Sequence, residues 1–198
     1  MMLTEETPVP SVALPVEEMK DHLRMGSGFA DDGLQDGLIE AHLRAAMAAI
    51  EGRIGKMLFQ RRFLWVLECW RDAEQALPVS PVTGITSLTL VDAAGGEVVV
   101  PGAAYRLVKD LHRPRLAGKG TALPTIPTEG LVKVVFDAGF GPAWTDIPVD
   151  LRQAVLLLAG EYYEHRHDDG AQAAGLPFGV VTLIERWRTV RILGGGKK

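Results

Sequence analysis

The chain has 198 residues, of which 47% are hydrophobic and 23% are charged, and its formal net charge is −4. A chain of this length fits one compact domain whose core needs neither a disulfide nor a structural metal. The acidic balance argues against a general nucleic-acid-binding domain, because such domains usually carry a clear basic excess.

Residues 1–14 are predicted to be a flexible amino-terminal extension that precedes the folded domain. They carry Glu5 and Glu6, with neither a positive start nor an apolar run, so they lack the features of a signal peptide. The longest apolar run of the chain, residues 154–159, is far shorter than the roughly 20 residues that cross a bilayer. We therefore expect a soluble protein that is made in the cytoplasm and has no membrane partner.

Two helices are predicted in the first part of the chain, over residues 15–25 and 32–55. Pro15 suits the first turn of a helix, because its missing N–H would have no partner there. The Asp31-Asp32 pair can cap the second helix, and Gly55 is a typical stop signal. Apolar side chains recur along the second helix with a period of about 3.6 residues, at Leu34, Leu38, Ile39, Leu43, Ala46, Ile50 and Ile54.

Residues 58–137 are predicted to form a small antiparallel β unit. Residues 112–130 within it hold three prolines and three glycines and are predicted to be a long exposed contact loop. Cys69, the only cysteine, is expected to be a small buried side chain without a disulfide within the chain. Strands are expected where branched and aromatic residues cluster or alternate with polar ones, over residues 59–70, 83–91, 97–100, 105–111 and 131–136.

Two further helices are predicted over residues 148–167 and 178–191, followed by a flexible basic tail over residues 192–198. A proline suits the first turn of each helix, and apolar residues recur at helical spacing along both. Together the elements predict an α+β fold in a single domain over residues 15–191. It is a bundle of about four helices with an inserted small antiparallel β sheet.

A cluster of Glu161, Glu164, His165 and His167 combines several metal-ligand residue types. It lacks the patterns of zinc proteases and di-iron bundles, and it closes an amphipathic helix, where cationic side chains favour the negative end of the dipole. We therefore expect a structural role and no metal. The sequence also has no Gly-x-Ser-x-Gly elbow and no complete phosphate-binding loop. No catalytic residue and no cofactor is predicted, and the chain is not expected to be an enzyme.

The two ends of the chain are opposite in charge. Residues 1–40 hold nine acidic residues against Lys20 and Arg24, a balance of −7. Residues 178–198 have a balance of +4, which leaves −1 for the middle of the chain. Unlike charges at the two ends suit a subunit that stacks between unlike partners.

The basic end combines cations with an aromatic side chain. Arg188 and Arg191 lie three residues apart on one predicted helix face beside Trp187, which suits a protein partner or a phosphate backbone. Three glycines then allow Lys197 and Lys198 to reach away from the body.

Several segments occur in an order and at separations that resemble the head–tail connector, or adaptor, family of long-tailed bacteriophages and gene transfer agents. The resemblance extends over residues 16–191. The segments that carry it are Asp31-Asp-Gly-Leu34, Ile85-Thr-Ser-Leu-Thr89, Val134-Val-Phe-Asp-Ala-Gly-Phe-Gly141, Ile147-Pro-Val-Asp-Leu-Arg-Gln-Ala-Val-Leu-Leu-Leu158 with Tyr162-Tyr-Glu-His-Arg166, and Leu176-Pro-Phe-Gly-Val180 with Leu183 and Trp187-Arg188.

The resemblance implies a structural role in the neck of a virion or gene transfer agent particle. Members of this family form rings, commonly dodecamers, between the portal protein and a stopper or tail-side neck protein, and DNA passes through the ring without sequence-specific binding. The carboxy-terminal segment of such subunits typically docks on the portal. Carried over to this chain, the portal-binding residues are Trp187, Arg188, Arg191, Lys197 and Lys198. Residues 112–130 are a weaker choice for contacts with a neighbour or a stopper.

Two other functions remain open at this point. The first is a metal-dependent enzyme built on the cluster at residues 161–167, which would bind metal stoichiometrically. The second is a small DNA-binding protein that uses the basic helix, and it would bind DNA with a strong dependence on salt.

Overall fold

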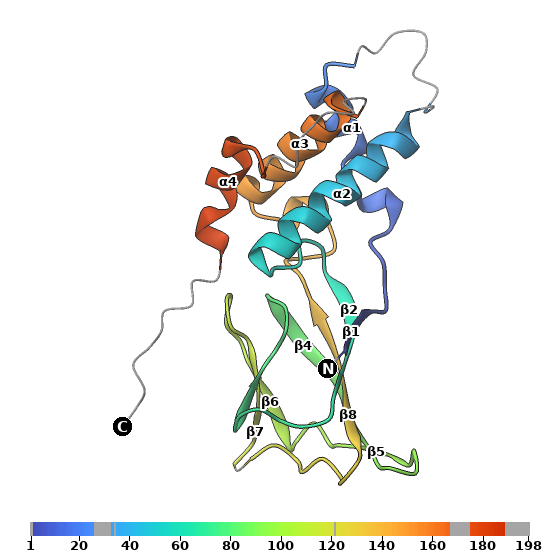
Figure 1. The fold of residues 1–198 in the computed structure, drawn as a ribbon, viewed down its shortest axis with the longest axis vertical. Coiled ribbons are helices and arrows are strands. Elements are labelled where there is room, and N and C mark those ends of the chain that lie inside the picture. Colours follow the sequence, from blue (N-terminus) through green and yellow to red (C-terminus); the bar gives the residue numbers. More distant parts are fainter. Residues whose placement is uncertain (1, 26–32, 34, 121, 167–174, 189–198) are drawn as a thin grey trace.

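The protein has a helical end and a β end, stacked along its long axis in the computed structural model (Figure 1). The structure describes residues 2–25, 33, 35–120, 122–166 and 175–188. The helices are α1 (Val16–His22), α2 (Asp36–Ile54), α3 (Val149–Glu164) and α4 (Phe178–Ile184), with short 3₁₀ turns at Ser11–Ala13, Trp144–Asp146 and Glu185–Trp187. The strands are β1 (Met2–Glu5), β2 (Arg61–Leu67), β3 (Glu74–Ala76), β4 (Val82–Val91), β5 (Glu97–Val99), β6 (Tyr105–Val108), β7 (Arg115–Gly118) and β8 (Leu131–Ala138). The predicted α+β fold is confirmed.

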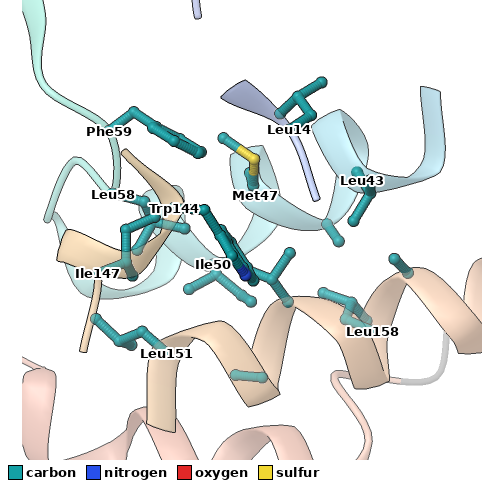
Figure 2. Packing of buried hydrophobic residues seen from close by; sticks show 14 of the residues in the cluster. Leu14, Leu43, Met47, Ile50, Leu58, Phe59, Trp144, Ile147, Leu151 and Leu158 are labelled. Carbon is teal, nitrogen blue, oxygen red and sulfur yellow. The ribbon is translucent and has the colours of Figure 1, made fainter. Parts of the chain in front are cut away.

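The helical end is held together by the apolar faces of α2 and α3. Leu43 and Ile50 of α2 are fully buried, as is Leu151 of α3. The apolar residues of each helix are spaced so that they lie on one face. Figure 2 shows Trp144 lying between the two helices beside Ile50. A fully buried aliphatic side chain of this kind contributes about 1.5–3 kcal/mol to folding.

The β end contains two antiparallel sheets that share a second core. One sheet has the strand order β1-β2-β8-β4-β5 and the other has the order β3-β7-β6. Buried and half-buried residues alternate without exception along β8, as expected for a strand with one face on a core. Trp65 and Leu88 lie opposite Val134 from the two neighbouring strands, and all three side chains are buried.

Three expectations for the non-helical segments are wrong. Met2–Glu5 is not a flexible extension: it is β1, which pairs with β2 from Met2↔Val66 to Glu5↔Phe63. Residues 112–130 are not one exposed loop, because Arg115–Gly118 forms β7 and Leu116 is fully buried. Cys69 is exposed, since it follows the end of β2 and not its buried face. In the first two cases tertiary pairing, and not local composition, decides the outcome.

The predicted helices are present but shorter than expected. Helix α2 begins at Asp36 and ends before Gly55, which adopts a left-handed conformation (φ 68°) as the C-cap. Helix α4 gives way at Glu185 to a 3₁₀ turn. The Asp31-Asp32 pair that was expected to cap α2 lies outside the described residues, and so does His167. Of the helices that the structure describes, none is long and apolar enough to span a membrane.

Candidate partner-binding site at the carboxy-terminal helix

Two of the five predicted contact residues, Trp187 and Arg188, fall within the described part of the chain. Arg191, Lys197 and Lys198 lie outside it. Trp187 ends the 3₁₀ turn Glu185–Trp187, and Arg188 follows in an extended conformation (ψ 136°). The helical turns therefore end at Arg188.

The side chain of Trp187 is packed inside the protein and hydrogen-bonded. It is only 8% exposed, and its ring meets that of Phe140 edge to face at a centroid distance of 5.4 Å. Its indole Nε1–H donates to Oδ2 of Asp150 at 2.7 Å. A buried indole N–H needs such a partner. Trp187 therefore holds the 3₁₀ turn Glu185–Trp187 against the body of the protein, and does not present a free aromatic surface.

Asp150 joins this turn to the start of α3. Its Oδ2 also accepts from Nε of Arg186 at 2.8 Å, while its Oδ1 accepts from the backbone N–H of Leu151 at 3.0 Å. The guanidinium of Arg186 lies 4.8 Å from the ring centroid of Trp187. Phe140, Asp150, Arg186 and Trp187 together are called the Asp150 cluster below. The cluster ties the 3₁₀ turn Glu185–Trp187 to the first turn of α3.

Sequence reasoning missed the Asp150 cluster, because its members are far apart in the chain. From the sequence, Asp150 is only an acidic residue in the first turn of a helix, where it favours the positive end of the helix dipole. Its bond to Trp187 crosses 37 positions and becomes visible only when α3 and α4 are packed.

Arg188 and Phe178 are among the exposed residues of this region. Arg188 donates to both carboxylate oxygens of Glu185, at 3.0 and 3.1 Å. Phe178 begins α4 and is 87% exposed, although it is one of the apolar residues at helical spacing along this helix. The buried face of α4 uses Val180 and Ile184 instead. A large aromatic side chain exposed to this extent can anchor a protein partner.

The cluster at residues 161–167 has the features of a solvated helix end. Nε2 of His165 lies 3.4 Å from Oε1 of Glu161, and both side chains are about half exposed. Among the residues that the structure describes, no group of three or more His, Cys, Asp or Glu side chains could hold a metal ion.

The chain is similar over almost its whole length to chains of gene transfer agent particles. A chain in the neck of an empty particle, computed with C6 symmetry, is 57% identical, with 98% of this chain and 99% of that chain covered and a TM-score of 0.90. A chain in the virion of a native particle is also 57% identical over the same shares, with a TM-score of 0.87. A chain in the neck of a native particle, computed with C12 symmetry, is 53% identical over the same shares, with a TM-score of 0.85. No protein-family model and no curated protein matches the chain.

Proposed function

The chain belongs to the head–tail connector family of long-tailed bacteriophages and gene transfer agents, and we propose that it is the adaptor subunit that joins the portal to the tail side of the neck. It is a structural protein of the particle neck. The observation that carries this conclusion is the likeness to the neck chains, at 53–57% identity over nearly the full length of both partners.

The proposed assembly is a ring of identical subunits around a central channel through which DNA passes. Repeated copies of one chain close into a ring when each copy contacts the next through two different surfaces and the rotation closes. The sixfold and twelvefold symmetries applied to the similar necks support a dodecamer. A stopper or other tail-side neck protein is the proposed partner on the opposite side of the ring.

The carboxy-terminal segment is proposed to dock on the portal. The Asp150 cluster gives this segment a fixed point of departure, so less conformational entropy is lost when it binds. Phe178 supplies an exposed aromatic anchor at the start of α4, and Arg188 begins the basic stretch that continues to Arg191, Lys197 and Lys198. Trp187 acts here as a positioning residue.

Co-assembly with the portal tests this function. Full-length protein mixed with its portal should form a ring-on-ring complex visible by electron microscopy, and Phe178→Ser or removal of residues 194–198 should weaken attachment. Val12→Ser is the matched control, because Val12 is 93% exposed but lies in the 3₁₀ turn before α1. Wild-type attachment by both altered proteins would contradict the portal-docking role of this end.

A further inference from the structure

Five exposed cationic residues gather on and beside the hairpin that β6 and β7 form. Residues 105–120 contain these five against a single carboxylate, that of Asp110, so their local balance is +4 in a protein whose net charge is −4. All five are exposed. The surface is called the cationic hairpin below, and it consists of Arg106, Lys109, Arg113, Arg115 and Lys119.

The hairpin holds these side chains on a packed scaffold. In the ladder Leu107 lies opposite Leu116, and these two residues face the core of the β end, where Leu116 is fully buried. Arg106 and Arg115 occupy the alternate positions and therefore face outward. The turn is tied to the body through Lys56, whose Nζ lies 3.1 Å from Nδ1 of His112.

The charge of the cationic hairpin is only partly neutralised within the chain. Arg115 forms an ion pair with Glu74 of β3. The carboxylate of Asp110 accepts the backbone N–H groups of His112 and Arg113 at 2.7 Å each, and these bonds hold its pKa below the usual range. Within the described residues, Arg106 and Lys109 have no ion-pair partner.

The chemistry of this surface fits phosphate groups better than a protein partner. Protein interfaces bury an apolar centre with aromatic anchors, and the one aromatic residue of the hairpin strands, Tyr105, is itself buried. Exposed arginine and lysine without an exposed aromatic anchor form the pattern that binds a nucleic-acid backbone.

We propose that the cationic hairpin is the surface that contacts the phosphates of DNA in the channel, an inference that rests on the ring function proposed above. Contacts to phosphate carry no sequence information, and electrostatic binding of this kind lets DNA slide along a protein. A ring lined in this way would guide the duplex at its axis while still allowing it to pass.

Photo-crosslinking in DNA-filled particles tests the contact directly. A photoreactive amino acid in place of Arg106 should crosslink to DNA, whereas the same group in place of Gln153, which is exposed on α3, should not. Crosslinks from position 106 to protein alone, or none at all, in particles with intact necks would overturn the proposal. Absence of the chain from the neck would instead contradict the proposed function, so the two failures can be told apart.

Neutralising the hairpin provides a second readout. Isolated portal–adaptor complexes that carry Arg106→Gln, Lys109→Gln and Arg115→Gln together should assemble normally. In a plot of the logarithm of the duplex-binding constant against the logarithm of the salt concentration, the slope should become shallower by about 0.9 for each DNA phosphate that the variant no longer neutralises. The control keeps the charge, with Arg106→Lys and Arg115→Lys. An unchanged slope rules against the DNA contact. Failure of the neutral variant to join the neck, while the control joins, would show that the hairpin binds a neck protein instead.

Discussion

Replacing Trp187 by phenylalanine should weaken both the stability of the protein and its attachment to the portal. The change keeps an aromatic ring against Phe140 but removes the hydrogen bond to Oδ2 of Asp150. A hydrogen bond to a charged group contributes about 1.5–3 kcal/mol. For a chain of this size each kcal/mol shifts the melting temperature by about 2–4 °C, so calorimetry should show a decrease of roughly 3–12 °C. The proposed attachment should weaken as well, because the turn Glu185–Trp187 is no longer held to Asp150 by the indole.

Trp144→Phe is the control that separates a loss of protein stability from a loss of the positioning role of Trp187. The indole of Trp144 is 6% exposed and also donates to a carboxylate, Oε2 of Glu18, at 2.8 Å, but it lies inside the helical core. This variant should lose a similar amount of stability and keep its portal attachment at temperatures where it stays folded. A positioning role for Trp187 is refuted if Trp187→Phe keeps wild-type attachment, or if both variants lose attachment equally.

Two further predictions concern the junction between the helical and β ends. Lys56→Met should raise the free energy of unfolding, because burial lowers the pKa of the Lys56 amine and its charge is costly there. Between the lowered pKa of the folded state and about 10.4, the Lys56 amine keeps its proton in the unfolded chain but not in the folded one, so the stability of the wild-type protein should rise with pH in that range. Denaturant titrations of the variant should not show this rise. Gly139→Ala should abolish soluble expression, since Gly139 has φ 134° and a Cβ there would lie 2.2 Å from the carbonyl oxygen of Phe59. Gly102→Ala, with no atom within 4 Å of the new methyl group, should express normally; equal yields for the two would contradict the packing argument.

The long elements could be predicted from the sequence because their burial repeats with a fixed period. The apolar stripes of α2 and α3 and the alternation of β8 are local signals, and each is present in the structure. Strand β1 has no such signal, since all four of its residues are exposed and only its pairing with β2 makes it a strand. Strand β7 lies among prolines and glycines that indicated a loop.

The sites could be predicted only where their residues are close in sequence. The basic end of the chain was visible as a charge balance, but the partner that fixes it, Asp150, belongs to another helix. The cationic hairpin was not visible in the charge balance of the middle of the chain. That balance is −1, because acidic residues elsewhere in the middle offset the +4 of the hairpin. Counting charge over a window of one hairpin, in place of the whole middle of the chain, would have found it.

In the proposed function one subunit binds partners at both of its ends, and the junction between the two ends explains how their positions are linked. Both oxygens of Glu51 on α2 lie 2.6 Å from Nη2 of Arg61, and Oε1 also accepts the backbone N–H of Leu58 at 2.7 Å. Nη1 of Arg61 reaches Oε2 of Glu5 on β1 at 2.8 Å, so one arginine links the last turn of α2 to two strands of the larger sheet. Breaking such a buried pair by removing one partner costs about 3–5 kcal/mol, which makes independent movement of the two ends unfavourable. A contact at the carboxy-terminal turn therefore also sets the orientation of the β end, as a ring subunit between unlike partners requires.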